Sequence, residues 1–533
     1  MIAVEGLQVE YVRGGEAVVA ARELSFELKT GTLVAILGES GSGKSTIARA
    51  IMGLIDEAKM EGAIRIGEER LPLGAIRNLR DYRWTKVSMV FQNSFNWFDP
   101  SFPLTYQILE VSRKRGVPPR IDLEGWIKSL GLSPGLLERY PHQVSGGERQ
   151  KALFLNAMIL DPPILLLDEP TSSMDRKSKR RVWEIIEGLK TEKGILLVTN
   201  NVEEAQRLAD EVIFIIRGTS VEVGPKEEVF SKPLHPYTRQ FIRSSPSLDR
   251  KKELERMKRA PAGGEGCPYA PRCFQKQKEC SKVFPPLQEV SPGRLIRCLL
   301  GGIETVCHLE GVTVSYEGKE VFPPVSLEIK RGETIAVVGK VGSGKTTLAR
   351  VMARQIRHFQ GKVTYNLSDL KREVQLIPQN PHETISHRFT VREVVEEPLL
   401  LHGPGRKEER SLLIKQSLEL VALPTTTAFL QEYPHHLSGG EIARLAIARG
   451  IVLSPTLLIA DEVTAGIDPV LRSDILHLLL ELQAEMGFSL TFITHDLGLA
   501  SKVADQVLDL DRHKYEGADN YWRRFAEEER GQK

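Results

Sequence analysis

Two glycine-rich segments have the residue types and spacing needed to bind a phosphate chain. The first runs Gly38-Glu39-Ser40-Gly41-Ser42-Gly43-Lys44-Ser45, and the second runs Gly339-Lys340-Val341-Gly342-Ser343-Gly344-Lys345-Thr346. In such a loop, main-chain N–H groups face phosphate oxygens, the lysine reaches the β- and γ-phosphates, and the hydroxyl binds Mg²⁺. The chain is therefore expected to bind a nucleoside triphosphate twice. The contacts expected at these loops are Gly38, Ser40, Gly41, Gly43, Lys44, Ser45, Thr46, Gly339, Gly342, Gly344, Lys345, Thr346 and Thr347.

Each half of the chain also has an acidic pair at the end of an apolar run. Asp168 and Glu169 follow residues 164–167, and Asp461 and Glu462 follow residues 457–460. The carboxyl ends of strands are where α/β sheets place their chemistry. We expect the aspartates to hold Mg²⁺ through water and the glutamates to polarise the hydrolytic water.

A Ser-Gly-Gly-Glu sequence precedes a helix in both halves. The serine hydroxyl and the free N–H groups at a helix start form a second anion site. The predicted nucleotide contacts here are Ser145, Gly146, Gly147, Glu148, Ser438, Gly439, Gly440 and Glu441. In both halves the aspartate of the acidic pair follows the serine by 23 positions, which indicates two copies of one fold.

Two glutamines and two tyrosines occupy matching places in the halves. Gln92 closes an apolar strand at 87–91, and Gln379 follows a strand at 374–377. Either glutamine could bind Mg²⁺ or hold the attacking water. Tyr11 and Tyr316 precede the two loops and could stack on adenine; a half-buried strand tyrosine is the alternative.

The elements that position these residues alternate in the manner of an α/β fold. Apolar runs at 33–37 and 334–338 predict buried strands before the glycine-rich loops, and helical segments follow. Residues 1–28 alternate apolar and polar positions and predict a strand pair. A chain of 533 residues with a twofold repeat fits two to four domains.

Composition limits the functional classes. There are 72 Lys and Arg against 70 Asp and Glu, a formal net charge of +2, so no nucleic-acid partner is expected. No apolar run is long enough to span a bilayer, and the first residues lack a secretory pattern. We expect a soluble intracellular protein that docks on a membrane protein.

The chain resembles the ATP-binding-cassette (ABC) ATPases. The resemblance rests on Tyr140-Pro141-His142-Gln143-Val144-Ser145-Gly146-Gly147-Glu148 and Asp168-Glu169-Pro170-Thr171. Gly224-Pro225 and Pro233-Leu234-His235-Pro236-Tyr237-Thr238 are similar to sequences in the ATPases of dipeptide, oligopeptide and nickel importers. The match covers nearly the whole chain.

The resemblance implies two tandem P-loop cassettes, each with a RecA-like core and a helical subdomain. We expect a first nucleotide-binding domain at 1–225, a linker of the oligopeptide-importer type at 226–305 and a second nucleotide-binding domain at 306–533. The partners implied are two transmembrane permease subunits and an extracytoplasmic substrate-binding protein. The segment after Gln92 would receive a coupling helix of the permease, and the protein would sit at the cytoplasmic face of the membrane.

The halves differ at one catalytic position. The family has Thr-His-Asp after the strand that here spans 195–198, and its histidine contacts the γ-phosphate and the attacking water. The first half has Thr199-Asn200-Asn201, whereas the second has Thr494-His495-Asp496. Because asparagine carries no titratable proton, we expect an impaired first site. The predicted catalytic residues are Glu169, Gln379, Glu462 and His495.

Four of the five cysteines lie close together in the expected linker. Cys267, Cys273, Cys280 and Cys298 are separated by 6, 7 and 18 residues, which favours a metal or cluster site. They resemble the four-cysteine tail of importer ATPases, some of which carry an iron–sulfur cluster. A [4Fe-4S] cluster is the prediction, with Zn²⁺, free thiols or disulfides as alternatives. Cys307 is expected to be a small buried residue.

These expectations lead to a function. The chain would hydrolyse ATP to drive an importer of di- and oligopeptides, with one complete and one degenerate site. Import of nickel or a metal chelate is the alternative substrate class. A soluble twin-cassette ATPase acting on ribosomes is the alternative of another kind, disfavoured by the position of the cysteines.

Overall fold

The computed structural model describes residues 1–13, 16–55, 58–76, 82–92, 97–245, 265–380, 385–403, 405–465 and 467–531. Residues 246–264 of the expected linker therefore lie outside the described part. The chain forms two compact units. The first contains Met1–Ser245, 265–272 and Gln277–Gly302, and the second contains Cys273–Lys276 and Ile303–Lys533.

A sheet of twelve strands forms the framework of the first unit. Its order is β5-β4-β1-β2-β10-β9-β3-β8-β7-β6, with β12 on β10 and β11 on β12. The central strands β3, β7 and β8 pair in parallel and consist of buried apolar residues, as expected for a sheet covered on both faces. The bounds are β1 (Ile2–Arg13), β2 (Glu16–Leu28), β3 (Leu33–Leu37), β4 (Ala58–Ile66), β5 (Glu69–Pro72), β6 (Val87–Val90), β7 (Ile164–Asp168), β8 (Gly194–Thr199), β9 (Glu211–Ile216), β10 (Thr219–Pro225), β11 (Gln288–Ser291) and β12 (Arg294–Ile296).

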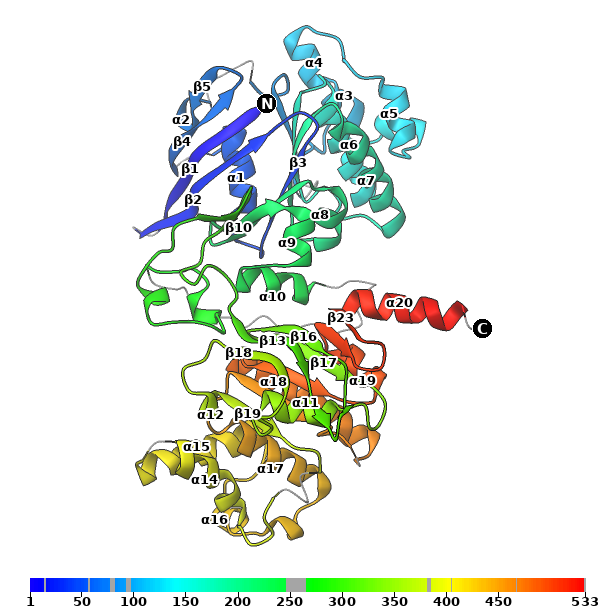
Figure 1. The fold of residues 1–533 in the computed structure, drawn as a ribbon. Coiled ribbons are helices and arrows are strands. Elements are labelled where there is room, and N and C mark those ends of the chain that lie inside the picture. Colours follow the sequence, from blue (N-terminus) through cyan, green and yellow to red (C-terminus); the bar gives the residue numbers. More distant parts are fainter. Residues whose placement is uncertain are drawn as a thin grey trace. The chain divides into compact units, whose positions relative to one another are not determined.

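The helices of the first unit form two groups. In Figure 1 the cyan helices α3, α4 and α5 gather beside α6, apart from the blue strands β1, β2 and β4. These helices lie between Gln92 and Ser145, where the resemblance implies a helical subdomain. The bounds are α1 (Lys44–Ile51), α2 (Leu73–Ile76), α3 (Leu104–Ile108), α4 (Glu110–Arg115), α5 (Leu123–Ser129), η2 (Pro134–Glu138), η3 (Pro141–Gln143), α6 (Gly146–Met158), α7 (Arg176–Lys190), α8 (Val202–Leu208), α9 (Lys226–Ser231), α10 (Pro236–Ser244), η4 (Ala270–Arg272) and η5 (Glu279–Ser281).

The segment after β10 folds back onto the first unit. Strand β12 pairs with β10, where Glu222 lies opposite Ile296. The Glu222 carboxylate is fully buried and accepts from the Arg294 guanidinium at 2.8 Å and from the His235 amide. Because a buried charge needs a partner, this ion pair ties β12 to the sheet edge.

The second unit repeats the parallel core on a smaller scale. Its main sheet has the order β19-β20-β21-β17-β22-β23, beside the sheets β16-β13-β18 and β14-β15. The strands predicted at 334–338, 374–377 and 457–460 are confirmed as β17, β19 and β20. The strand bounds are β13 (Thr305–Thr313), β14 (Ser315–Tyr316), β15 (Lys319–Glu320), β16 (Val325–Lys330), β17 (Thr334–Val338), β18 (Gln360–Tyr365), β19 (Val374–Ile377), β20 (Leu457–Asp461), β21 (Ser489–Ile493), β22 (Gln506–Asp509) and β23 (Lys514–Gly517).

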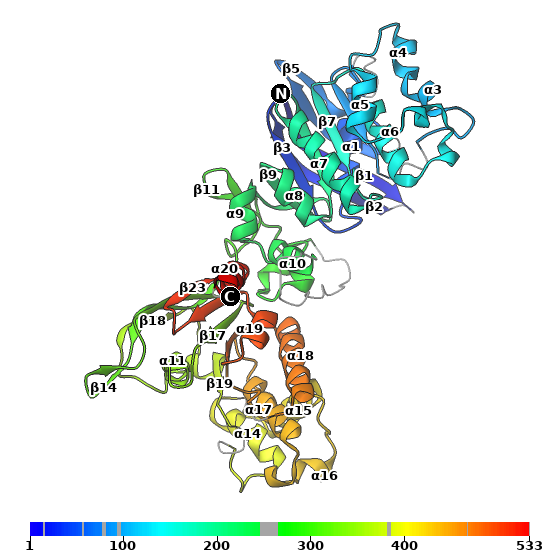
Figure 2. The same cartoon turned by 90° about the vertical axis from the view of Figure 1, so that its right-hand side faces the viewer.

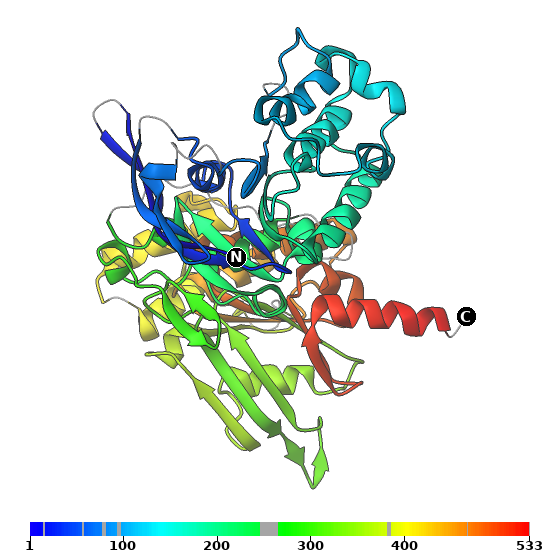
Figure 3. The same cartoon turned by 90° about the horizontal axis from the view of Figure 1, so that it is seen from above.

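Helices of the second unit cover this sheet and extend from it. Figure 2 shows α14, α15 and α16 gathered at one end of the unit, away from β18 and β23. In Figure 3 the red C-terminal helix α20 extends outward from its unit, anchored near its start by Tyr521 and Trp522. The bounds are α11 (Lys345–Met352), α12 (Leu370–Glu373), α14 (Val391–His402), α15 (Lys407–Leu420), α16 (Thr427–Leu430), η6 (Pro434–His436), α17 (Gly439–Ile451), α18 (Pro469–Met486), α19 (Leu497–Val503) and α20 (Ala518–Gly531).

Two further features are a buried cysteine and the character of the helices. Cys307 is fully buried in β13, which confirms its predicted role as a small core residue. Among the described residues, no helix combines the length and apolar character that crossing a bilayer requires.

Candidate active sites

The first glycine-rich loop joins the central strand β3 to α1. Lys44 begins α1, and its buried ammonium donates to the carbonyls of Gly38 at 2.7 Å and Glu39 at 2.8 Å. Gly43 has φ of 98°, and a Cβ there would lie 2.0 Å from the carbonyl oxygen of Ala20. Only glycine fits that position, which brings the loop against β2 and turns the start of α1 outward.

Side-chain oxygen atoms of the kind that bind Mg²⁺ lie around this loop. The Ser45 hydroxyl donates to Asp168 Oδ1 at 3.0 Å. Asp168 Oδ2 and Ser42 Oγ are buried without a hydrogen-bond partner. Burial raises the pKa of Asp168 to about 6 despite the hydrogen bond from Ser45. Unpaired buried oxygens beside an N-terminal helix end fit a cation and its phosphate ligand.

Glu169 follows Asp168 in a strained conformation. Its φ is +46°, in the left-handed region, and Glu462 of the second unit has the same value. Gln92 Nε2 donates to Glu169 Oε2 at 2.7 Å. Such strain at an acidic side chain is typical of a functional site. The structure therefore brings Lys44, Ser45, Gln92, Asp168 and Glu169 together, as predicted.

The second loop has the same construction with an added histidine. Lys345 Nζ donates to the carbonyls of Gly339 at 2.9 Å and Lys340 at 2.8 Å, and lies 3.9 Å from Glu462 Oε1. Gln379 Nε2 donates to Glu462 Oε2 at 3.0 Å. His495 Nδ1 lies 3.4 Å from Glu462 Oε1. This geometry gives one glutamate three polar neighbours, as a base that orients water requires.

The two acidic pairs share their environment. Burial raises the pKa of Asp461, although its hydrogen bond with Thr346 opposes the shift. Asp461 Oδ1 and Ser343 Oγ are buried without partners, like their equivalents in the first unit. The same donor set is therefore available for Mg²⁺ in both units.

Asn200 takes the place of the histidine in the first unit. In each unit a main-chain amide donates to the hydroxyl of the threonine two residues before it: Asn201 to Thr199 and Asp496 to Thr494, both at 3.0 Å. The turns are therefore equivalent in hydrogen bonding, and the side chains of Asn200 and His495 are both exposed. What differs is the chemistry of one side chain.

Comparison with known proteins identifies the family. The family profile described as ABC transporter matches residues 21–172 and again 322–465. The chain belongs to the ABC transporter family. A second profile, described as the C-terminal region of oligopeptide/dipeptide transporters, matches residues 221–280. Together with the catalytic groups described above, the family assignment makes this chain an ATP-hydrolysing enzyme.

Individual relatives match over nearly the full length of this ABC transporter ATPase. The glutathione import ATP-binding protein GsiA of Salmonella typhimurium is 31% identical, over 95% of this chain and 84% of that protein. The protein of the same name from Escherichia coli O157:H7 is 30% identical with the same coverage. A dimeric bacterial ABC transporter cassette of known structure is 26% identical, over 42% of this chain and 99% of that one, with a TM-score of 0.38.

The Ser-Gly-Gly motifs of the ABC ATPase start α6 and α17 with capping boxes. The Glu148 amide donates to the Ser145 hydroxyl at 3.3 Å, and the Ser145 amide donates to the Glu148 carboxylate at 2.9 Å. Ser438 and Glu441 repeat the arrangement. Hydrogen bonds from the capping serines lower the pKa of both glutamates. These contacts explain the Ser and Glu positions by helix capping alone, and their contact with nucleotide stays a prediction.

The tyrosines proposed to stack on adenine lie on the early strands. Tyr11 is half-buried in β1 and packs against the core of the first unit. Tyr316 is 57% exposed at the end of β14. Tyr316 is exposed enough to stack on an adenine ring, whereas Tyr11 packs like an ordinary strand residue. Stacking on adenine stays a prediction for both tyrosines.

The cluster predicted at the four cysteines finds no support in the described residues. Cys267, Cys280 and Cys298 belong to the first unit and Cys273 to the second. Burial raises the pKa of the Cys267 thiol, which opposes the thiolate form that metals bind. Among the described residues, no group of three or more His, Cys, Asp or Glu side chains could hold a metal ion. The structure thus gives no support to an iron–sulfur or zinc site.

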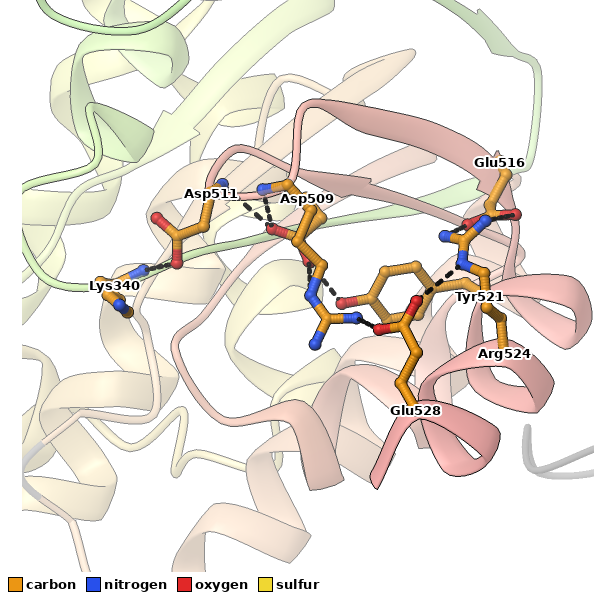
Figure 4. Close-up of polar contacts among 8 residues, drawn as sticks. Lys340, Asp509, Asp511, Glu516, Tyr521, Arg524 and Glu528 are labelled. Carbon is orange, nitrogen blue, oxygen red and sulfur yellow. Dashed lines mark hydrogen bonds and ion pairs between the residues drawn. The ribbon is translucent and has the colours of Figure 1, made fainter. Parts of the chain in front are cut away.

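Sequence reasoning missed the residues that anchor the second P-loop from outside. The amide of Lys340 donates to Asp511 Oδ2 at 2.8 Å, and Asp511 is positioned by its own amide, which donates to Asp509 Oδ1 (Figure 4). Asp509 also accepts from the buried Tyr521 hydroxyl of α20 at 2.6 Å. The acidic sequence Asp509-Leu510-Asp511 at the end of β22 was the feature of the sequence that could have indicated this anchor.

Replacement of Asp168 should change how stability depends on pH. Its pKa in the folded chain, about 6, lies above the ordinary value of 3.8. The folded state therefore holds a proton that the unfolded state releases between these values. The free energy of unfolding therefore falls by about 3 kcal/mol as pH rises from 3.8 to about 6. We expect the free energy of unfolding of Asp168→Asn, relative to that of wild type, to increase from pH 4 to pH 6. Urea denaturation at each pH measures this difference.

A control exists on α7. Hydrogen bonding by Ser178 lowers the pKa of the helix-capping Asp175. Stability from such a carboxylate is lost only as pH falls below its ordinary pKa of 3.8, so the difference between Asp175→Asn and wild type should stay nearly constant from pH 4 to pH 6. A pH-independent difference for Asp168→Asn would contradict the assignment.

Replacement of Asp511 should weaken nucleotide binding at the second loop. Asp511→Ala removes the acceptor that orients the Lys340 amide, and we expect about a fivefold rise in the Kd of Mg²⁺ and MANT-ATP. The measurement uses the Lys44→Ala background, in which the second loop alone keeps its lysine. Asp511→Asn keeps an oxygen acceptor and serves as the control. Identical Kd values for Asp511→Ala and its parent would contradict the role.

Proposed function

We propose that the chain is the ATP-hydrolysing motor of an importer for di- and oligopeptides, bound peripherally at the cytoplasmic face of the membrane. The observation that carries this proposal is the match of residues 221–280 to the C-terminal region of oligopeptide/dipeptide transporters. Relatives that resemble the whole chain are named for import of glutathione, itself a tripeptide. Nickel and metal-chelate import has no such support.

The two nucleotide sites are proposed to be unequal composites. In this arrangement the tandem cassettes pack head to tail, and each P-loop meets the Ser-Gly-Gly motif of the other cassette. One site combines Lys345, Thr346, Gln379, Asp461, Glu462 and His495 with Ser145, Gly147 and Glu148. The other combines Lys44, Ser45, Gln92, Asp168 and Glu169 with Ser438, Gly440 and Glu441, and has Asn200 at the histidine position. The contact of His495 with Glu462 supports this inequality.

The chemistry assigned to each group follows from its contacts. Glu462 is held by Gln379 and lies beside His495, so it can orient a water for attack while the histidine meets the γ-phosphate. The Lys345 ammonium balances charge that develops on the phosphate. Asparagine at position 200 can donate a hydrogen bond but cannot exchange a proton, so the first site serves mainly to bind ATP.

Glutamine substitutions test the inequality. Glu462→Gln removes the carboxylate of the complete site and should lower kcat for ATP hydrolysis by about a hundredfold. Glu169→Gln changes the site that lacks the histidine and should keep more than half of the wild-type rate. Steady-state phosphate release measures both, and MANT-ATP binding confirms that both variants still take up nucleotide. Equal losses in the two variants would overturn the assignment.

A cavity in the first unit supports a permease partner. Its volume is about 430 Å³, and it lies between β6 with the end of α1 and the helices α3, α4 and α6. Met89, Phe91, Trp97, Phe98 and Leu153 supply its apolar lining. Trp97 stacks on Phe91 with 3.7 Å between ring centroids, and its indole N–H donates to the Gln92 carbonyl at 3.2 Å. A permease segment inserted here would press on the residue that holds Glu169.

Co-purification tests both partner and cavity. The tagged full-length chain, solubilised gently from its native membranes, should bring down two multispan permeases and a binding protein. Trp97→Ala should reduce the permease yield at least severalfold, while Trp126→Ala on α5, outside the cavity lining, should not. Ribosomal proteins without permeases would refute the importer, and equal permease yields from both variants would refute the cavity as the docking place.

A further inference from the structure

The first P-loop contains an acidic residue where a phosphate must bind. Glu39 follows the first glycine of the loop, and its side chain is 37% exposed. A carboxylate beside a triphosphate opposes binding, because like charges repel most strongly where water is partly excluded. The equivalent residue of the second loop, Lys340, carries the opposite charge. The first loop therefore needs a compensating cation that the second does not.

Arg272 supplies this cation from far along the chain. Its guanidinium donates to both oxygens of Glu39, at 2.7 Å to Oε1 and 3.1 Å to Oε2. The arginine side chain is only 10% exposed, so the pair is shielded from solvent on the arginine side. Two parallel donors to one carboxylate form the strongest type of ion-pair contact that side chains make.

The segment around Arg272 is built to hold it in place. The Arg272 amide donates to the Tyr269 carbonyl at 2.9 Å, and the guanidinium carbon lies 5.4 Å from the centroid of the Tyr269 ring. Tyr269 is almost fully buried, and its ring packs edge-on against that of Tyr237. The Cys267 amide donates to the Cys280 carbonyl at 2.8 Å and closes the loop that contains this segment.

Tyr237 contacts the same loop residue. Its fully buried hydroxyl accepts from the Glu39 amide at 3.0 Å. The Glu39 carbonyl in turn accepts from Lys44 Nζ. The amide, carbonyl and carboxylate of Glu39 are therefore each fixed by a different side chain, and two of these side chains, Tyr237 and Arg272, come from the chain after β10.

We propose that Arg272 is a positioning residue of the first ATP site, which neutralises Glu39 and fixes the loop so that a triphosphate can bind. Nucleotide affinity at this site depends on residues 265–272 being folded against the loop. The second site lacks this dependence, since its loop carries Lys340 and is held by Asp511. This role extends the ATPase activity and does not depend on which solute is transported.

Binding of MANT-ATP with Mg²⁺ to the full-length chain tests the proposal. In the Lys345→Ala background, where the first loop alone keeps its lysine, Arg272→Ala should raise Kd by about tenfold. Arg272→Gln keeps hydrogen-bond donors without the charge and should weaken binding nearly as much. Adding Glu39→Gln to Arg272→Ala removes the uncompensated carboxylate and should restore Kd to within about threefold of its parent.

The same variants separate charge compensation from a purely structural contact. In the Lys44→Ala background, which reports the second site, Arg272→Ala should leave Kd unchanged. Thermal unfolding monitored for each variant establishes that the chain is folded. A Kd at the first site that is unaffected by both arginine substitutions would overturn the proposal. So would a loss of affinity in Arg272→Ala that Glu39→Gln fails to reverse.

Discussion

An ammonium group buried among main-chain carbonyls is the interaction on which each nucleotide site depends. Lys44 and Lys345 both donate to two carbonyls of their own loop, and burial lowers the pKa of Lys44 while the neighbouring carboxylates oppose that shift. A buried cation is costly unless it is paired, and the main-chain carbonyls of its own loop supply the partners. Buried aspartate oxygens without partners complete the picture of a site prepared for its ligand.

The two units build their glycine-rich loops and acidic pairs in the same way but surround them with partly different side chains. Both place a strained glutamate after the aspartate and hold it with a glutamine. They differ in the residue that follows the next strand and in how the loop is anchored.

Much of the fold and of each catalytic set could be predicted from the sequence. Buried parallel strands are short apolar runs, and the acidic pairs and glutamines lie at their ends, so Asp168, Glu169 and Gln92 were predictable as one group. The predicted cysteine site has no support among the described residues, and spacing shows which thiols are near in sequence but not how the chain folds between them. Arg272 and Asp511 escaped prediction for the same reason: each acts on a loop reached only through the folded chain.

The bond between Arg272 and Glu39 joins residues 233 positions apart, and this separation has a consequence for synthesis. A ribosome adds about 5 to 20 residues per second, so the glutamate is made roughly 10 to 50 seconds before its arginine. During that interval the first loop carries an unbalanced negative charge. If Arg272 has the role proposed above, a nascent first cassette binds nucleotide less tightly until the segment that carries this arginine has left the ribosome.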